Sequence, residues 1–386
     1  MINNPKYLVC CALAVAGMMV SCSSEDSEPT CAGSEEVVFV TPEPTRAGVT
    51  TTANLTAKPF TVYGDMSLAG GEGDLTVLMN GSQATYNTSE KKWNYGTTLY
   101  WFPNHVHSFV ALHPIEAINS TRTVTDVKYD DGRLSFNYTH PSDYKKASDL
   151  LVATHRRQYV QELGKRAEPV SLTFGHILSV LDIQIRYCEE LAYNNWNNRI
   201  EVTEIVLDGI NVSGTYNVRP NDLNETNASS GTDAHDGSGW SNLKTGSSAF
   251  RGDTYNEWNT GHINQEVTQP PVFKPIFKNT DAFIVLPKAS GDVKLTMTFK
   301  LYVNGTYAAD HTLSTVLENA EWGAGQKITY SLQVKVGEIL QGGCKIEEWN
   351  NIDELTETIT DTNSDHDAGQ GNLNTGEWSN IGQDWQ

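Results

Sequence analysis

The sequence predicts an all-β protein built from two tandem antiparallel sandwiches. Short runs with a two-residue apolar period follow one another along most of the chain, and none of them shows a long helical period. Turn pairs such as Asn80-Gly81, Asp131-Gly132 and Asn304-Gly305 lie between such runs, and pairs of this kind favour tight hairpins. The 386 residues suffice for two domains of ordinary size after a leader and a polar tail are set aside.

Residues 1–22 are typical of an export signal that ends in a lipidated cysteine. Lys6 precedes the apolar run Tyr7 to Val20, which is too short and too soon followed by polar residues to span a membrane. The run ends in Met19-Val20-Ser21-Cys22, which resembles a bacterial lipobox. Acyl chains on Cys22 would hold the protein at a membrane, because they bury many methylene groups. A plain signal peptide with a chance cysteine is the alternative.

Residues 23–46 are predicted to form a tether that contains one short strand. The first of these residues are acidic and serine-rich, and they are either a surface-export signal or a solvated linker. Glu35 to Thr41 is rich in β-branched residues and favours a strand. The prolines that follow make the next connection extended and exposed. The bond between Arg46 and Ala47 is therefore a candidate protease site, with an ordinary surface arginine as the alternative interpretation.

The first sandwich is predicted over residues 47–169 and the second over residues 170–352. At their junction, Val170 to Tyr187 alternates in one register up to Val180 and in the opposite register from Leu181. A one-residue slip turns every side chain to the other face of a sheet. The shift therefore marks either a bulge or a strand that leaves one sheet and enters another, and we place the hinge between two domains here.

A polar insertion, residues 219–269, interrupts the second sandwich. Loops of this length are usually functional or disordered. Its few large apolar residues include Trp240, Tyr255 and Trp258, which are candidate binding residues of an exposed loop. Residues 353–386 are acidic and are predicted to be flexible, with Leu355 to Ile359 as the one strand-like stretch.

The net charge and the motif content exclude several classes of function. A formal charge of -20, from 47 acidic and 27 basic residues, disfavours a nucleic-acid partner, since phosphate binding needs the opposite sign. No nucleophile elbow, zinc-protease motif or phosphate loop occurs, so we predict neither an enzyme nor a cofactor. Proteins and neutral glycans are the expected partners.

Three further motifs are weak signals. His105, His107 and His113 lack a cysteine or carboxylate to complete a metal site, and we interpret them as ordinary strand-edge histidines. The alternating residues Asp361 to Asp367 resemble the start of a calcium loop, but a histidine stands where that loop needs glycine. Arg251-Gly252-Asp253 matches the integrin-binding tripeptide, which is short enough to arise by chance.

A set of short motifs runs along the chain from Cys22 to Trp349. They are the lipobox, Thr45-Arg46-Ala47-Gly48, Tyr100-Trp101-Phe102-Pro103, Ser108-Phe109-Val110-Ala111, Asp149-Leu150-Leu151-Val152-Ala153, Phe174-Gly175-His176-Ile177-Leu178-Ser179, Gly214-Thr215-Tyr216, Phe283-Ile284-Val285-Leu286-Pro287 and Trp322-Gly323-Ala324-Gly325-Gln326-Lys327. Taken together and in this order, they resemble the fimbrillin or Mfa-like proteins of Bacteroidetes.

The resemblance implies two tandem transthyretin-like sandwiches, export to the outer membrane as a lipoprotein, and polymerisation into surface fimbriae. Polymerisation would follow removal of an N-terminal strand by a trypsin-like protease. In this chain the cut would fall after Arg46, and the candidate released strand is Val37, Val38, Phe39 and Val40. The partners would be other fimbrial subunits, with a host or bacterial surface ligand for adhesion. The insertion and the acidic tail depart from the family pattern and leave shaft, tip and accessory roles open.

A function from a different class remains open at this point. It is a monomeric surface lipoprotein that binds a glycan or a host protein through the aromatic residues of the insertion. A mature chain that starts at Ala47 would fit polymerisation, whereas one that retains lipidated Cys22 would fit a monomeric binder or an anchor.

Overall fold

The computed structural model describes residues 35–41, 52–70, 75–141, 147–162, 166–187, 199–220, 239–251, 273–276, 283–318, 320–335 and 337–348. Within these ranges the chain is mostly β-strand and forms several antiparallel sheets, which confirms the all-β prediction. Among the helices of the same ranges, none combines the length and the apolar character needed to cross a membrane.

The elements follow one another as short strands with two short helices among them. In chain order they are β1 (Phe39–Val40), α1 (Thr52–Ala57), β2 (Phe60–Leu68), β3 (Thr76–Asn87), β4 (Lys92–Asn94), β5 (His105–His113), α2 (Glu116–Asn119), β6 (Val124–Asp130), β7 (Arg133–Thr139), β8 (Leu151–Tyr159), β9 (Val170–Ser171), β10 (Gly175–His176), β11 (Ser179–Tyr187), β12 (Arg199–Val218), β13 (Trp240–Arg251), β14 (Lys274–Pro275), β15 (Phe283–Val285), β16 (Val293–Val303), β17 (Thr306–Leu317), β18 (Gln326–Val334) and β19 (Ile339–Glu348).

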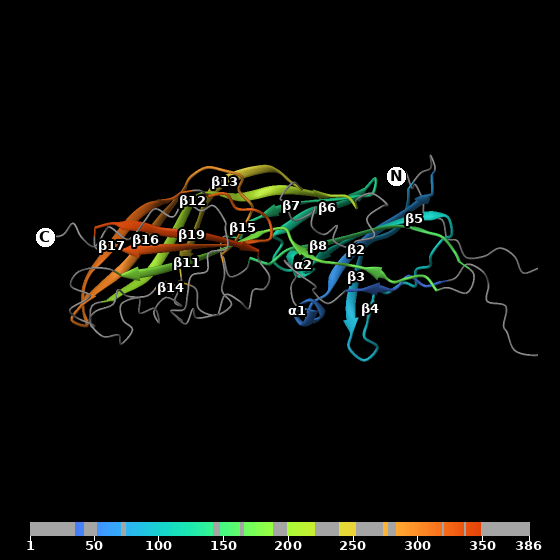
Figure 1. Ribbon diagram of the computed structural model, residues 1–386, viewed down its shortest axis with the longest axis horizontal. Coiled ribbons are helices and arrows are strands. Elements are labelled where there is room, and N and C mark those ends of the chain that lie inside the picture. The colour runs from blue at the N-terminus through green and yellow to red at the C-terminus, as the bar shows by residue number, and fades with distance from the viewer. Residues whose placement is uncertain are drawn as a thin grey trace, which may run out of the picture.

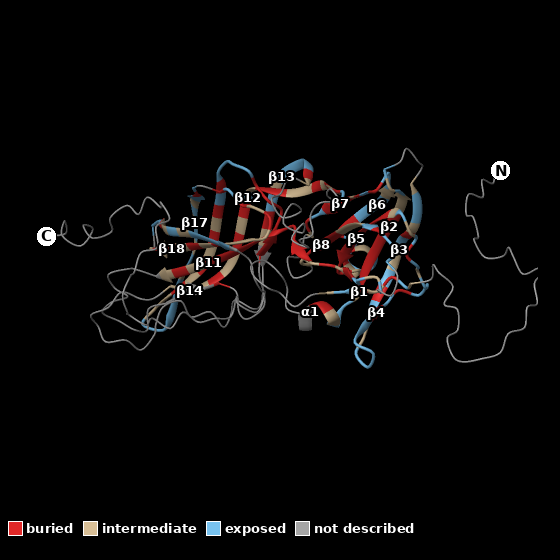
Figure 2. Cartoon of the chain, turned by 45° about the vertical axis from the view of Figure 1, so that its right-hand side comes forward, coloured by how far each residue is buried: buried red, intermediate tan, exposed pale blue. Residues whose placement is uncertain are grey.

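The N-terminal sheet has the strand order β10-β8-β5-β2-β3-β4 and occupies one end of the elongated molecule (Figure 1). Its central strands β2 and β5 are buried along nearly their whole length, as the red ribbons of Figure 2 show. Continuous burial of this kind requires cover on both faces of a sheet. One face packs against β6, β7 and the end of β12, and the other face packs against residues that include β1 and β9.

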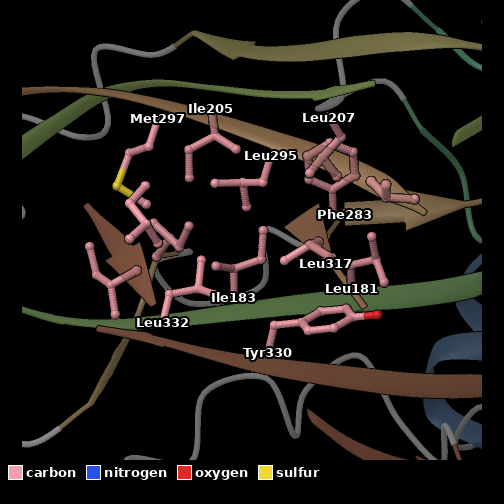
Figure 3. Packing of buried hydrophobic residues seen from close by; sticks show 14 of the residues in the cluster. Leu181, Ile183, Ile205, Leu207, Phe283, Leu295, Met297, Leu317, Tyr330 and Leu332 are labelled. Atoms are coloured by element: carbon pink, nitrogen blue, oxygen red, sulfur yellow. The ribbon is translucent and has the colours of Figure 1, made fainter. Parts of the chain in front are cut away.

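Two further sheets extend toward the other end of the molecule, and the β6 and β7 end of one of them packs on the N-terminal sheet (Figure 1). The long sheet has the order β17-β16-β12-β7-β6, with β13 also paired to β12, and the C-terminal sheet has the order β14-β11-β18-β19, with β15 also paired to β11. Their inner faces enclose the largest apolar cluster, in which Leu181 and Ile183 of β11 lie opposite Leu207 of β12 and Leu295 of β16 (Figure 3). This face-to-face packing is the arrangement of a β-sandwich.

At the junction between the predicted domains, the chain passes from one sheet to another and does not form a simple bulge. Gly175 pairs with Val152 in the N-terminal sheet, and a few residues later Val180 pairs with Lys327 in the C-terminal sheet. The chain therefore leaves one sheet and enters another at the register shift, as one of the two sequence alternatives predicted.

The hydrogen-bonded sheets do not divide at residue 169. Strand β12 pairs with β16 along its first part and with β7 along its last part, so that one sheet contains strands from both sides of the predicted boundary. Tyr216 and Trp240 of the second predicted domain also lie in one apolar cluster with Phe136 of the first. The division into two domains stays a prediction.

The turn predictions were confirmed at two sites and wrong at one. Asp131-Gly132 and Asn304-Gly305 turn β6 into β7 and β16 into β17, and all four residues have positive φ, as type I′ turns require. Asn80-Gly81 does not end a strand, because β3 continues through it to Asn87. The glycine, at φ 81°, lies instead at a register shift opposite β2, which makes it a bulge.

The polar insertion is not a continuous loop. Residues 240–251 form β13, a strand that pairs with β12 from Tyr216 back to Glu204. Serine, threonine and glycine dominate β13, so its composition resembled that of a loop. Pairing to the long β12 determined the strand, and local propensity did not.

Candidate functional site at the N-terminal segment

Residues 35–41, the N-terminal segment, lie between two stretches that are far away in sequence. On one side the Val37 amide donates to the Leu99 carbonyl at 2.7 Å, and the Trp101 amide donates to the Glu35 carbonyl at 2.9 Å. A bridge of antiparallel type between Glu36 and Tyr100 describes the same contact. The segment is thus paired as a strand along this edge.

The opposite edge of the segment pairs with β9 in parallel. The Val170 amide donates to the Val38 carbonyl at 2.7 Å, and the Leu172 amide donates to the Val40 carbonyl at 2.9 Å. Both edges of a five- to seven-residue stretch therefore carry main-chain hydrogen bonds. This is the position of an inserted strand, since an end strand would bond along one edge only.

Alternate side chains of the segment enter the core. Val37 and Phe39 have no exposed surface, while Val40 is 37% exposed. The Phe39 ring meets the rings of Tyr95 and Phe109 edge to face, with centroids 5.0 Å and 5.2 Å away. The two buried side chains cover the face of the N-terminal sheet that carries Phe109.

Polar side chains hold both ends of the segment. The Glu35 carboxylate accepts a hydrogen bond from the Ala167 amide, and the Tyr95 hydroxyl donates to the Val37 carbonyl. Burial, and secondarily the charge of Glu36, raises the pKa of Tyr95 to about 12, so the hydroxyl stays protonated and remains a donor. At the far end the Trp93 indole donates to the Thr41 hydroxyl at 3.4 Å.

The wall beside the segment is a stack of aromatic and cationic groups. The Arg157 guanidinium lies 4.4 Å from the centre of the Trp101 ring and donates to the Glu168 carbonyl at 3.0 Å. The His107 ring packs edge to face against the Trp101 ring, with centroids 4.8 Å apart. Burial lowers the pKa of His107 to about 4, so this wall contains a neutral imidazole near neutral pH.

The sequence model of the Fimbrillin-like family matches residues 45–349. The chain belongs to this family. The resemblance predicted from the ordered motifs is confirmed. The match includes residues 99–101 and 170–172, which pair with the N-terminal segment, and it begins after residues 35–41.

Solved structures from Bacteroides and Parabacteroides species match most of the chain at low sequence identity. A candidate cell adhesion protein from Bacteroides uniformis is 16% identical, with 84% of this chain and 100% of that chain covered at a TM-score of 0.42. A fimbrial assembly protein from Parabacteroides distasonis is 10% identical, with 81% and 94% covered at a TM-score of 0.34. No curated protein matches the fimbrillin-like chain in sequence.

The candidate released strand is the one predicted site that the structure describes in full. Val37, Val38, Phe39 and Val40 form an inserted strand, with two of the four side chains buried. Cys22 and the bond between Arg46 and Ala47 lie outside the described residues, so lipidation and cleavage stay predictions.

The prediction that Trp240 lies in an exposed binding loop is wrong. Its side chain is only 8% exposed, its indole donates to the Ile177 carbonyl at 2.7 Å, and its ring packs against Tyr216 with centroids 5.0 Å apart. Pairing of β13 with β12 carries Trp240 into the core of the fimbrillin-like fold. Tyr255 and Trp258 lie outside the described residues.

The weak chemical signals give no site. His107 and His113 are buried on β5, which has strands on both sides, so the interpretation of strand-edge histidines is wrong for these two. Within the described ranges, no group of three or more histidine, cysteine, aspartate or glutamate side chains is placed to hold a metal. The calcium-like stretch lies outside those ranges, as do Gly252 and Asp253 of the tripeptide.

Sequence reasoning missed the residues that receive the segment. Leu99, Trp101, Ala167, Val170 and Leu172 supply the hydrogen bonds, and only Trp101 stood in a motif that had been singled out. The one available signal was the density of aromatic residues between Trp93 and Phe102, which exceeds what a surface connection needs.

Proposed function

We propose that this fimbrillin-like protein is a structural or accessory subunit of surface fimbriae, exported to the outer membrane as a lipoprotein through Cys22 and contributing to adhesion. The observation that carries the proposal is the N-terminal segment, which is inserted between residues 99–101 and β9 and precedes the predicted Arg46-Ala47 cleavage site in the sequence. Two tandem transthyretin-like sandwiches are the architecture that we propose for the subunit. The proposal assigns the chain no catalytic activity and no cofactor.

Strand exchange would assemble the subunits. While the chain is intact, the segment is tethered to the fold and competes at a high effective concentration against any strand from outside. Cleavage after Arg46 removes that advantage, because the segment is then held by non-covalent contacts alone. Its departure would leave two unpaired edges, at Leu99 to Trp101 and at Val170 to Leu172, and such edges recruit strands.

The incoming strand must satisfy the same two requirements as the segment. It needs main-chain groups for both edges and two apolar side chains at alternate positions to replace Val37 and Phe39. Full burial of each such side chain stabilises by about 1.5–3 kcal/mol, so the replacement strand recovers about 3–6 kcal/mol from these contacts. We propose that it comes from the C-terminal region of another subunit.

Treatment of purified protein that starts at Ser23 with a trypsin-like protease tests the proposal. Cleaved protein is expected to form ladders on gels run without boiling, and the Arg46→Ala variant is expected to remain monomeric. Mass spectrometry of the mature protein should find a chain that starts at Ala47. Protein that is cut at Arg46 and stays monomeric at high concentration would contradict self-polymerisation.

The competing function, a monomeric lipoprotein that binds a glycan or a host protein, loses part of its support. It depended on exposed aromatic residues in the polar insertion, and Trp240 is a buried core residue. A mature protein that retains lipidated Cys22 and binds a glycan as a monomer would restore it.

A further inference from the structure

Among the described residues, no strand pairs with the second edge of β13. In the described part of the chain, β13 pairs only with β12, and residues 241–245 together with Ser247 are exposed. Figure 1 shows β13 along the rim of the molecule, outside β12. A twelve-residue strand with one free edge presents a row of main-chain donors and acceptors that can pair with another extended segment.

A pocket at the start of β13 connects this edge with the end of the fold. Leu243 of β13, Gln326 of β18 and Ile346 of β19 line a pocket of about 370 Å³ together with Trp240, Lys288 and Trp322. Leu243 and Ile346 remain 39% and 47% exposed, so the mouth of the pocket is apolar. Lys288 also lines the pocket and is only 8% exposed, so it places a cationic group in the pocket wall.

The C-terminal tail leaves the fold at this pocket. Strand β19 ends at Glu348, which pairs with the pocket residue Gln326. Roughly ten residues then separate Ile346 from Leu355, and an extended chain of that length reaches about 30 Å. The tail is thus long enough to lie along the free edge of β13 without leaving its own subunit.

The charges of the two segments are complementary. Strand β13 contains Lys244 and Arg251 and no acidic residue, although the protein as a whole carries a charge of -20. The tail from Trp349 onward contains no lysine or arginine and no proline, and its residues Leu355 to Ile359 alternate as a strand does. A tethered tail acts on the edge of its own subunit at an effective concentration in the millimolar range, which favours it over a strand from outside.

We propose that the tail segment Leu355 to Ile359 binds in its own subunit as an added strand on the free edge of β13. Leu355, Glu357 and Ile359 share one face of such a strand, so the segment offers two apolar side chains and one carboxylate to the pocket face with Leu243, Ile346 and Lys288. The inference does not depend on cleavage at Arg46 or on strand exchange.

Hydrogen exchange of β13 tests this placement. Protein from Ser23 to Gln386 is compared with the same protein ending at Asn350, which retains every described residue. The β13 amides that face away from β12 are expected to exchange about tenfold more slowly in the longer protein. The Ile359→Pro variant is expected to lose this protection, because proline removes a donor and breaks the pairing, while Ile381→Pro, the same change further along the tail, keeps it.

Two charge variants and a dilution series decide the remaining alternatives. Glu357→Lys is expected to weaken the protection, because it places an ammonium group beside Lys288, whereas Thr358→Lys, on the opposite face of the added strand, is expected to keep it. The protection should be the same at 2 and at roughly 200 μM protein, since binding within one chain does not depend on concentration. Equal exchange of β13 in the long and short proteins would overturn the inference, and protection that rises with concentration together with particle size would assign the edge to a second copy.

Discussion

Replacement of Phe39 by alanine is the most direct perturbation of the N-terminal segment. The ring has no exposed surface and meets Tyr95 and Phe109 edge to face, so its removal leaves a cavity in the face of the N-terminal sheet. Truncation of a buried phenylalanine costs about 3–5 kcal/mol. These ring contacts form only while the segment is bound, so their loss weakens binding of the segment. The fraction of molecules with the segment released should therefore rise by roughly a hundredfold to a few thousandfold.

Hydrogen exchange at two amides reports this release. The amides of Val170 and Leu172 donate to the Val38 and Val40 carbonyls, so they become free to exchange when the segment leaves. We expect both to exchange faster in Phe39→Ala by the factor above, while amides in the middle of β5 change far less. Val40→Ala is the matched control, since its side chain is 37% exposed on the same segment.

Two outcomes would refute the reasoning. Equal exchange at Val170 in Phe39→Ala and Val40→Ala would show that the buried ring does not hold the segment. Equal acceleration at Val170 and throughout β5 would show that the segment opens only when the whole fold unfolds. Assembly of subunits could then not begin with release of the N-terminal segment.

Three further predictions follow from burial and from the leader. Burial lowers the pKa of His107, His113 and His155 from 6.5 to about 4, so the unfolded chain binds protons in this window that the folded chain does not. The stabilisation from these neutral histidines should be fully present above pH 6.5 and should be lost as the pH drops toward 4, by up to about 1.4 kcal/mol per pH unit for each histidine. Urea titrations should show that the free energy of unfolding falls less steeply with pH in the His113→Gln variant. Trp240→Ala should lower the free energy of unfolding by about 3–5 kcal/mol, because the indole is buried. Leu243→Ala, at a 39% exposed position on the same strand, should lower it much less. Equal losses in the two variants would contradict the core placement of Trp240. Cys22→Ala should abolish fatty-acid labelling of the protein in cells, and labelling that persists would rule out the lipobox.

The aromatic wall of the segment site illustrates where sequence reasoning stopped. The β-branched residues between Glu35 and Thr41 predicted a strand, and the structure buries Val37 and Phe39 of this stretch. This composition could not identify the partners of the strand, because Leu99 and Val170 are remote in sequence and main-chain pairing leaves no trace in side-chain identity. The same limit applied to Trp240, whose polar neighbours suggested a loop until pairing with β12 determined its environment.

The sequence by itself determined the β class, the register shift near Val180, two of the three tight turns and the family, because these depend on short-range periodicity, on residues that tolerate positive φ and on motifs in order. Only the tertiary structure decided that β12 joins strands from both predicted domains, that β13 is a strand, and that the N-terminal segment is inserted between Leu99 and Val170. Each of these depends on pairing between strands that are distant in the chain. Such pairing is selected by the total burial and hydrogen bonding of the folded protein, and local sequence does not encode it.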